Sequence, residues 1–161
     1  RPPLSTTTLS VAPSKSIGSL LGKSLLYCRE NGETGAYLYS RWSDTPSALI
    51  QHSLLASLTD AAVFASLSSS TSLAQVDWVL ESDLNAFCHR FSESMSEGYI
   101  DITYRLVDTR TKRLRSSKRF TISSPAPSMD AQGGVDALKN ATRELNSQSI
   151  AWLTTLIKEN Q

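Results

Sequence analysis

The sequence predicts an α+β fold in which two helices pack on one face of a mainly antiparallel sheet; a mixed sheet is the alternative. Three observations support this prediction. Apolar residues recur at three- and four-residue steps over 46–60, which is typical of an amphipathic helix. A longer stripe of the same period closes the chain between residues 128 and 158. Alternating segments come before and between these two, and this order lets both helices bury their stripes on one sheet face.

The length of the chain suits a single domain. Its 161 residues are enough to bury roughly 70% of the unfolded surface without a covalent staple. Residues 1–6 are Pro-rich and polar, which predicts a tether, and residues 7–161 then form one α+β domain. Because the sequence starts at Arg1 without methionine, we expect a processed chain whose export signal lay upstream.

Three strands are expected before the first helix. Residues 7–12 alternate weakly, which predicts an edge strand. The runs 24–29 and 36–42 flank Asn31-Gly32, a strong turn signal, so we expect them to form a hairpin.

The first helix should begin at Pro46 and end near Asp60. Thr45 is suited to the N-cap, and proline at the first helical position is favoured because its missing N–H would be unpaired there. A short apolar segment, 63–65, follows. Residues 66–74 are rich in Ser and Thr, so we expect a loop there.

Three long strands are expected next, over 76–91, 99–107 and 113–123. The first changes its alternating register near the middle, which indicates either a bulge or a strand covered on both faces. The second shows the strict alternation of a half-buried antiparallel strand. The inward-facing side chains of the third are expected to be Leu114, Phe120 and Ile122.

The second helix should start after a cap at Ser128 or Asp130 and reach about Lys158. Gly133 and Gly134 are expected to weaken its first turn. Its apolar stripe is expected to consist of Val135, Leu138, Ala141, Leu145, Ser149, Trp152 and Leu156.

The charge of the chain does not favour a nucleic-acid partner. Sixteen basic and fifteen acidic residues leave a formal charge of +1, whereas nucleic-acid-binding domains normally carry a clustered basic face. Basic residues concentrate only over 110–119. The preferred interpretation is a solvated hairpin, and the alternatives are contacts with an anionic lipid headgroup or an acidic protein patch. No run of 18 apolar residues is present, so no membrane-spanning helix is expected.

Cys28 and Cys88 lack the spacing of a metal site, and no metal or cofactor site is expected. Both fall in predicted strands. Buried free thiols are the preferred interpretation; a disulfide, which an oxidising compartment would favour, and a functional thiol remain open.

The residues do not indicate an enzyme, and we expect no catalytic residue. His52 and His89 are isolated, and no nucleophile elbow or phosphate-binding loop is present. Glu81 and Asp83 share one strand face, where carboxylates are usually solvated rather than paired in a cleft.

The candidate functional residues are Tyr37, Tyr39, Arg41 and Trp42, just before the first helix. One interpretation is cross-strand packing of the rings at the hairpin. The other is a partner-binding surface, because Tyr, Trp and Arg dominate interface hot spots. Arg41 would then face a partner, or else stack on a ring or pair with Asp44.

Several segments together resemble one known family. They are, in chain order, Leu9-Ser-Val-Ala-Pro13, Gly22-Lys-Ser-Leu-Leu-Tyr-Cys-Arg29, Tyr39-Ser-Arg-Trp42 followed by Pro46, the strand 76–87, Leu106-Val-Asp-Thr-Arg-Thr-Lys-Arg113, the segment 128–138 and Trp152-Leu153. The chain therefore resembles the ABC-type transport auxiliary lipoproteins, which include the lipoprotein of the paraquat-inducible system. The resemblance extends from about Leu9 to Leu156, but Cys28 and Cys88 are not part of the family pattern.

The resemblance implies a periplasmic domain. An N-terminal lipid on an upstream cysteine would hold this domain at the outer membrane. The implied partners are a mammalian-cell-entry (MCE) domain protein and an ABC transporter permease and ATPase that move lipids. The domain would dock these partners without catalysis or cofactor. The alternative is another envelope scaffold lipoprotein without a link to lipid transport. An edge strand over 7–12 and an uncovered sheet face would also permit a homo-oligomer.

Overall fold

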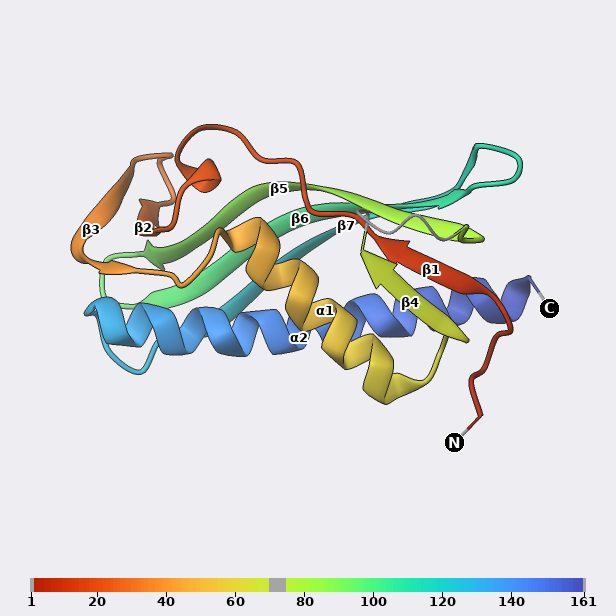
Figure 1. The fold of residues 1–161 in the computed structure, drawn as a ribbon. Coiled ribbons are helices and arrows are strands. Elements are labelled where there is room, and N and C mark those ends of the chain that lie inside the picture. Colours follow the sequence, from red (N-terminus) through yellow and green to blue (C-terminus); the bar gives the residue numbers. More distant parts are fainter. Residues whose placement is uncertain (1, 70–74, 161) are drawn as a thin grey trace.

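The computed structural model describes residues 2–69 and 75–160 (Figure 1). One large sheet is packed against two helices, so the predicted α+β class is confirmed. The helices are α1 (Pro46–Ala61) and α2 (Ala131–Glu159), and a 3₁₀ turn, η1, spans Gly18–Leu21. The strands are β1 (Thr8–Val11), β2 (Ser24–Arg29), β3 (Thr34–Arg41), β4 (Ser66–Ser69), β5 (Trp78–Phe91), β6 (Ser96–Asp108) and β7 (Arg113–Pro125).

The sheet is mixed, so the expectation of a mainly antiparallel sheet is wrong. The pairs β1–β4, β1–β5 and β2–β5 are parallel, whereas β2–β3, β5–β6 and β6–β7 are antiparallel. Only the antiparallel pairs are joined by tight turns. The parallel pairs need long crossovers, which leave no local sequence signal.

The strand β1 lies inside the sheet, between β4 and β5, rather than at its edge. Residues 66–69 form the edge strand β4 instead of the expected loop, because they pair with β1 from Thr8 opposite Ser66 to Val11 opposite Ser69. The rest of the expected loop, residues 70–74, lies outside the described residues. Self-association through an edge near residues 7–12 therefore loses its structural basis.

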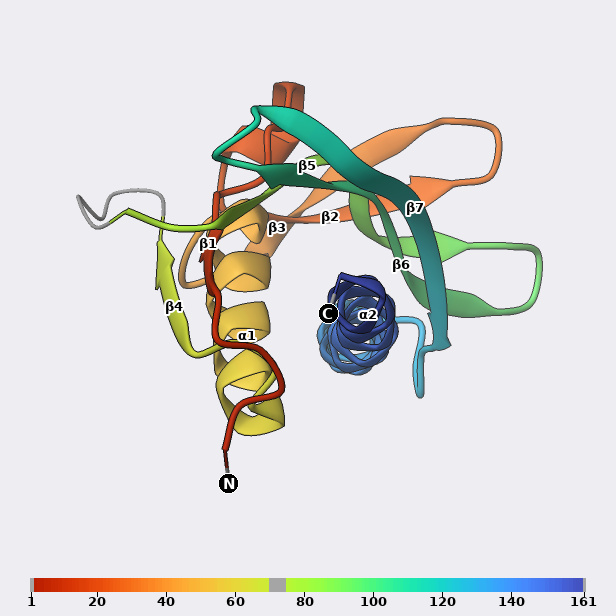
Figure 2. The ribbon, with the colours of Figure 1, turned by 90° about the vertical axis from the view of Figure 1, so that its right-hand side faces the viewer.

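Both helices lie on one face of the sheet, as predicted, and the sheet curls around α2 (Figure 2). The predicted caps are confirmed: Thr45 accepts a hydrogen bond from the Ala48 N–H, and Asp130 accepts one from the Gly133 N–H. Most of the predicted α2 stripe is buried against the sheet, while Val135 and Trp152 are partly buried. No helix of the described chain is both long and apolar enough to span a membrane.

Two register shifts decide which side chains face the core. The shift in β5 between Leu84 and Ala86 favours the bulge over the alternative of a strand covered on both faces. A second shift, between Leu106 and Val107 of β6, changes the register of β7. Phe120 and Ile122 point inward as expected, but Leu114 is 55% exposed, so its predicted burial is wrong.

The outer face of the sheet is polar. Cross-strand ion pairs lie on it: Arg105 pairs with Asp83 at 2.6 Å and with Glu81 at 3.6 Å, Arg119 pairs with Asp101 at 2.8 Å, and Arg90 pairs with Glu97 at 3.1 Å. The hydrogen bond from Arg105 holds the pKa of the Asp83 carboxyl below its usual range. Exposed pairs of this kind add little stability.

Candidate functional site

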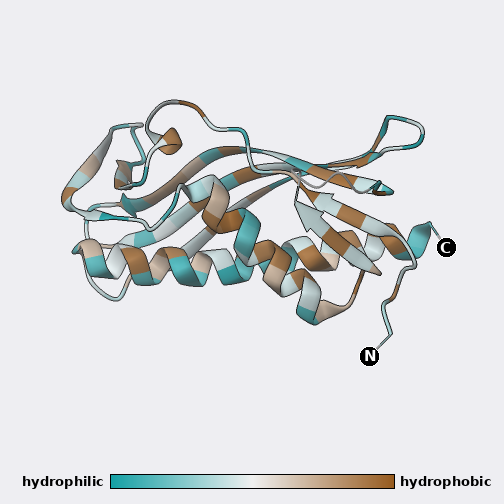
Figure 3. Ribbon diagram, viewed as in Figure 1, coloured by the Kyte–Doolittle hydropathy of each residue, from teal (hydrophilic) through white to brown (hydrophobic). Residues whose placement is uncertain are grey.

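Exposed apolar side chains gather at one end of the molecule. Eight large hydrophobic side chains of the described residues are exposed, and six lie in or next to the η1 turn, β3, the β5–β6 turn and the start of α2. These segments lie together at the left-hand end in Figure 1, and Figure 3 shows the hydropathy along the ribbon. We call this region the apolar end. Its exposed hydrophobic residues are Ile17, Leu21, Leu38, Tyr39, Met95 and Met129.

The strand β3 projects from the sheet at the apolar end because it carries three extra residues. Ala36 pairs with Leu26 and Arg41 pairs with Ser24, so five steps along β3 face two steps along β2. A bulge of this kind pushes the unpaired residues 37–40 away from the ladder. The predicted site therefore lies on a protrusion.

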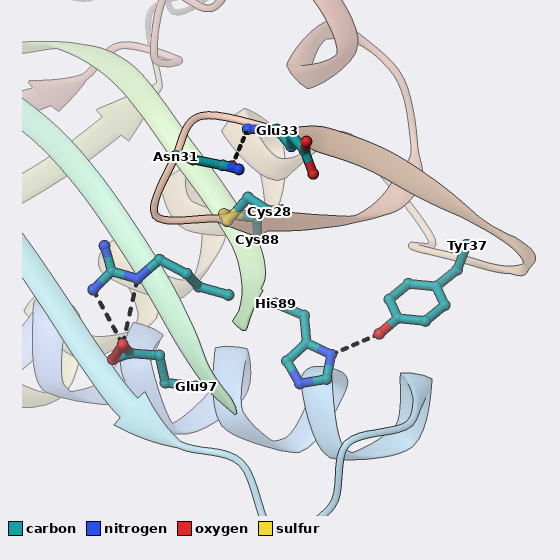
Figure 4. Close-up of a disulfide and its surroundings, with 8 residues drawn as sticks. Cys28, Asn31, Glu33, Tyr37, Cys88, His89 and Glu97 are labelled. Carbon is teal, nitrogen blue, oxygen red and sulfur yellow. Dashed lines mark hydrogen bonds and ion pairs between the residues drawn. A yellow bond between two sulfur atoms is a disulfide. The ribbon is translucent and has the colours of Figure 1, made fainter. Parts of the chain in front are cut away.

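Tyr37 fixes the base of this protrusion. Its hydroxyl lies 2.8 Å from Nδ1 of His89, within hydrogen-bonding distance (Figure 4). Its ring meets that of Tyr27 edge-on at 5.5 Å. Burial, with smaller effects of Asp130 and Tyr27, raises the pKa of the Tyr37 phenol. Tyr37 is thus an anchor and not a free contact residue.

Trp42 fixes the other side of the protrusion. Its backbone N–H donates to the Lys23 carbonyl at 2.7 Å, and its ring packs edge-on against Phe87 with the ring centroids 5.6 Å apart. The indole Nε1 is buried without a hydrogen-bond partner in the part of the chain that the structure describes. The packing interpretation thus accounts for Tyr37 and Trp42.

Tyr39 and Arg41 are exposed between these anchors. The Tyr39 side chain is 97% exposed. Among the described residues Arg41 forms no ion pair, so it does not pair with Asp44, and it stacks on no aromatic ring. Between the two tyrosines lies Leu38, which is 87% exposed and which sequence reasoning missed. A leucine between two tyrosines in a strand next to a turn was the available signal. The structure thus brings all four predicted residues together but gives them two different roles.

His89 connects the protrusion to the body of the protein. It is fully buried, and Nε2 lies 2.8 Å from the Ser96 hydroxyl on β6. A Cβ at Gly134 would come within 2.7 Å of the imidazole, so glycine allows α2 to approach the ring directly. Both ring nitrogens of His89 therefore have hydrogen-bond partners inside the fold. Burial lowers its pKa below the usual 6.5, and the nearby Asp130 opposes this effect.

We expect this histidine to make the protein less stable in mild acid. The unfolded chain takes up the proton near pH 6.5, but the native chain takes it up only at lower pH. Between these values the unfolded state holds more protons, so stability is full above about pH 6.5 and falls as the pH drops towards the native pKa. Urea midpoints at about pH 7.5 and about pH 5.5 measure the effect, and His89→Gln should reduce it. An imidazole that titrates at or above its usual pKa by NMR would contradict this expectation.

Cys28 and Cys88 form a disulfide with their Cα atoms 5.9 Å apart, so the expectation of free thiols is wrong. The parallel pairing of β2 with β5 places the two cysteines side by side, which the sequence pattern could not show. The bond joins β2 to β5 at the residue before His89, and in Figure 4 it lies to the upper left of the His89–Tyr37 contact.

An apolar cleft of about 540 Å³ lies beside the disulfide. Leu20 from η1, Leu26 from β2 and Phe87 from β5 contribute to its lining, with Tyr99 from β6. The exposed Ile17 also lines it. The apolar end thus combines a protrusion with a recess. Within the described residues, no group of three His, Cys, Asp or Glu side chains is placed to bind a metal ion.

Known proteins share this fold. A family model described as an ABC-type transport auxiliary lipoprotein component matches residues 3–151. A Xanthomonas campestris protein of family DUF330 has a TM-score of 0.90 at 18% identity, over 98% of this chain and 90% of that chain. A hypothetical protein from Chlamydia trachomatis has a TM-score of 0.65 at 8% identity, over 95% and 98%.

The dodecameric PelC of Paraburkholderia phytofirmans has a TM-score of 0.52 at 13% identity, over 90% of this chain and 88% of that chain. No curated protein matches the chain. At such identities the likeness to solved structures establishes the fold alone, and the match to the family model carries the relationship.

Proposed function

The chain belongs to the family of ABC-type transport auxiliary lipoprotein components, and from this premise we propose that it docks a partner protein of a lipid-transport system. In this proposal it works as a non-enzymatic accessory domain. The partners are an MCE-domain protein and the ABC permease and ATPase complex. The observation that carries the proposal is the apolar end, where most of the exposed large hydrophobic side chains gather.

The apolar end has the physical properties of a protein-binding surface. Contiguous exposed apolar residues are rare on monomers and often mark interaction sites. Tyr39 and Arg41 are residue types that dominate binding energy. The anchors Tyr37 and Trp42 hold the protrusion in place before binding, which lowers the entropy lost on association.

We assign this docking to the periplasm, at the outer membrane. The family name describes lipoproteins, which are anchored to envelope membranes. The Cys28–Cys88 disulfide supports an oxidising compartment, because such bonds are rare in the cytosol. A homo-oligomer is part of the proposal, and light scattering of the purified chain tests it.

Changing Leu38 and Tyr39 together to serine should weaken binding to the purified MCE-domain protein by at least tenfold. Loss of a central aromatic anchor typically costs about 2 kcal/mol or more of binding energy. Both side chains are exposed, so the free energy of unfolding should change by less than about 0.5 kcal/mol. Titration calorimetry measures the first effect, and urea unfolding measures the second.

Leu114→Ser is the matched control, because it removes an exposed leucine from β7, away from the apolar end. It should leave the affinity unchanged. If the Leu38/Tyr39 variant binds the MCE-domain protein as tightly as the wild type does, the apolar end is not the docking surface.

Trp42→Ala should instead act on stability. Deleting a fully buried Trp side chain costs about 3–5 kcal/mol, and this partly buried ring should cost about 2 kcal/mol. Partner binding measured well below the unfolding temperature should fall less than in the Leu38/Tyr39 variant. A stable Trp42→Ala protein that does not bind would make Trp42 a contact residue and not an anchor.

A further inference from the structure

The turn between β6 and β7, together with the first residue of β7, carries three cations that have no ion-pair partner among the described residues. Arg110, Lys112 and Arg113 are exposed, and none pairs with an acidic group in the described parts of the chain. The next basic residues behave differently, since Arg115 pairs with Glu159 at 2.8 Å and Arg119 pairs with Asp101. Acidic partners therefore neutralise part of the basic run 110–119 along β7, whereas the charges at its start, over 110–113, are not neutralised.

An apolar side chain and a fixed backbone accompany these cations. Leu114, next in the chain, is 55% exposed. Asp108 holds the turn by accepting hydrogen bonds from the N–H groups of Arg110 and Thr111. Residues 108–114, which we call the basic tip, retain two net positive charges.

The basic tip and the N-terminus lie at the same end of the molecule, opposite the apolar end. Figure 1 shows this end on the right, and in Figure 2 it faces the viewer. The N-terminal segment is held there by N–H groups of Leu4 and Ser5, which donate to the carbonyls of Ala62 and Val63. The long axis of the protein therefore runs from a cationic end that holds the N-terminus to an apolar end.

We propose that the basic tip contacts the anionic phospholipid headgroups of a membrane and orients the protein with its apolar end away from that membrane. Guanidinium and ammonium groups next to one exposed leucine match an interface of phosphates above hydrocarbon. Their positions in a short turn let all three cations approach the surface within a Debye length. Each cation near such a surface strengthens binding roughly fivefold. The orienting role rests on the proposed docking function, but the lipid contact does not.

Vesicle sedimentation tests the contact directly. The purified chain should bind vesicles of equimolar phosphatidylcholine and phosphatidylglycerol, should bind pure phosphatidylcholine vesicles much more weakly, and should lose binding as salt is added. Replacing Arg110, Lys112 and Arg113 by glutamine should lower the vesicle affinity by about a hundredfold. Adding Leu114→Ser to this triple variant should lower the vesicle affinity further than the loss of the three charges alone.

The matched control is the triple glutamine variant of Lys23, Lys139 and Arg143. These residues are also exposed and outside the ion pairs, and the change in net charge is the same. It should keep its vesicle affinity within about twofold, because the lost charges lie away from the tip. Equal loss in both triple variants, or no binding to anionic vesicles at all, would overturn the proposal; the latter would leave an acidic protein surface as the partner of the tip.

The two proposals fail independently. The tip variant should bind the MCE-domain protein normally in solution, and the Leu38/Tyr39 variant should bind vesicles normally. A tip variant that loses both activities while remaining folded would show that one surface serves both, which contradicts the orientation proposed here.

Discussion

Serine at both Cys28 and Cys88 should lower the free energy of unfolding by about 4 kcal/mol. The disulfide joins residues 60 positions apart, and closing a loop of this length removes much of the conformational entropy of the unfolded chain. The bond also supplements a short ladder, because β2 pairs with β5 only over Tyr27–Arg29 and His89–Phe91. Urea unfolding of the oxidised protein and the double variant measures the difference.

Reduction provides the matched test of the disulfide. Dithiothreitol should destabilise the wild-type protein by a similar amount and should leave the double serine variant unchanged. Since β2 and β3 carry the protrusion, the reduced protein should also bind its partner more weakly. A wild-type protein whose unfolding midpoint does not respond to reductant would show that the two thiols are not joined in solution.

The helices could be predicted from the sequence because their signals are local. The N-caps Thr45 and Asp130 and the apolar periodicity each lie within a few turns of the element that they define. The three long strands could be predicted for the same reason, since their alternation is continuous. The strands β6 and β7 extend beyond the predicted 99–107 and 113–123 because polar residues continue the ladder, whereas β5 begins at Trp78, after the predicted start at residue 76.

The parallel pairings could not be predicted, because they depend on contacts between distant residues. The strand β4 has the composition of a loop, Ser-Leu-Ser-Ser, and becomes a strand only because β1 offers it a partner. The disulfide depends in turn on the parallel pairing of β2 with β5. Both errors have one physical cause: long crossovers carry no turn signal.

The candidate site could be predicted in part. Residue type marked Tyr39 and Arg41 as candidate interface residues, but the sequence could not separate them from the anchors Tyr37 and Trp42. That distinction arises from the bulge in β3 and from His89, which lies 52 residues from Tyr37. The wider apolar end was missed because four separate segments build it.

Gly98→Ala should destabilise the protein by about 3 kcal/mol. Gly98 lies in β6, where α2 crosses closely: a Cβ would lie 2.5 Å from the Ala137 carbonyl carbon and 2.7 Å from the Leu138 nitrogen. These are backbone atoms of a helix, which cannot move aside as a flexible side chain can, so helix and sheet must separate. Overpacking usually costs about 1–3 kcal/mol and occasionally more, and we expect this contact with rigid helix backbone to exceed the usual range. Lower entropy of the unfolded chain offsets only about 0.4–1 kcal/mol.

Gly22→Ala is the matched control for this substitution. Its nearest contact would be the Ser19 carbonyl oxygen at an ordinary 3.8 Å, and its φ of −99° suits alanine. Gly22→Ala should therefore leave the melting temperature unchanged or raise it slightly, whereas Gly98→Ala should lower it by about 6–12 °C for a domain of this size. Equal melting temperatures for the two variants would show that α2 does not pack against β6 as closely as the structure indicates. A large fall in melting temperature for Gly98→Ala alone would establish that the crossing at Gly98 holds the long helix in place. This crossing would thereby also hold the Asp130–Gly134 turn against His89.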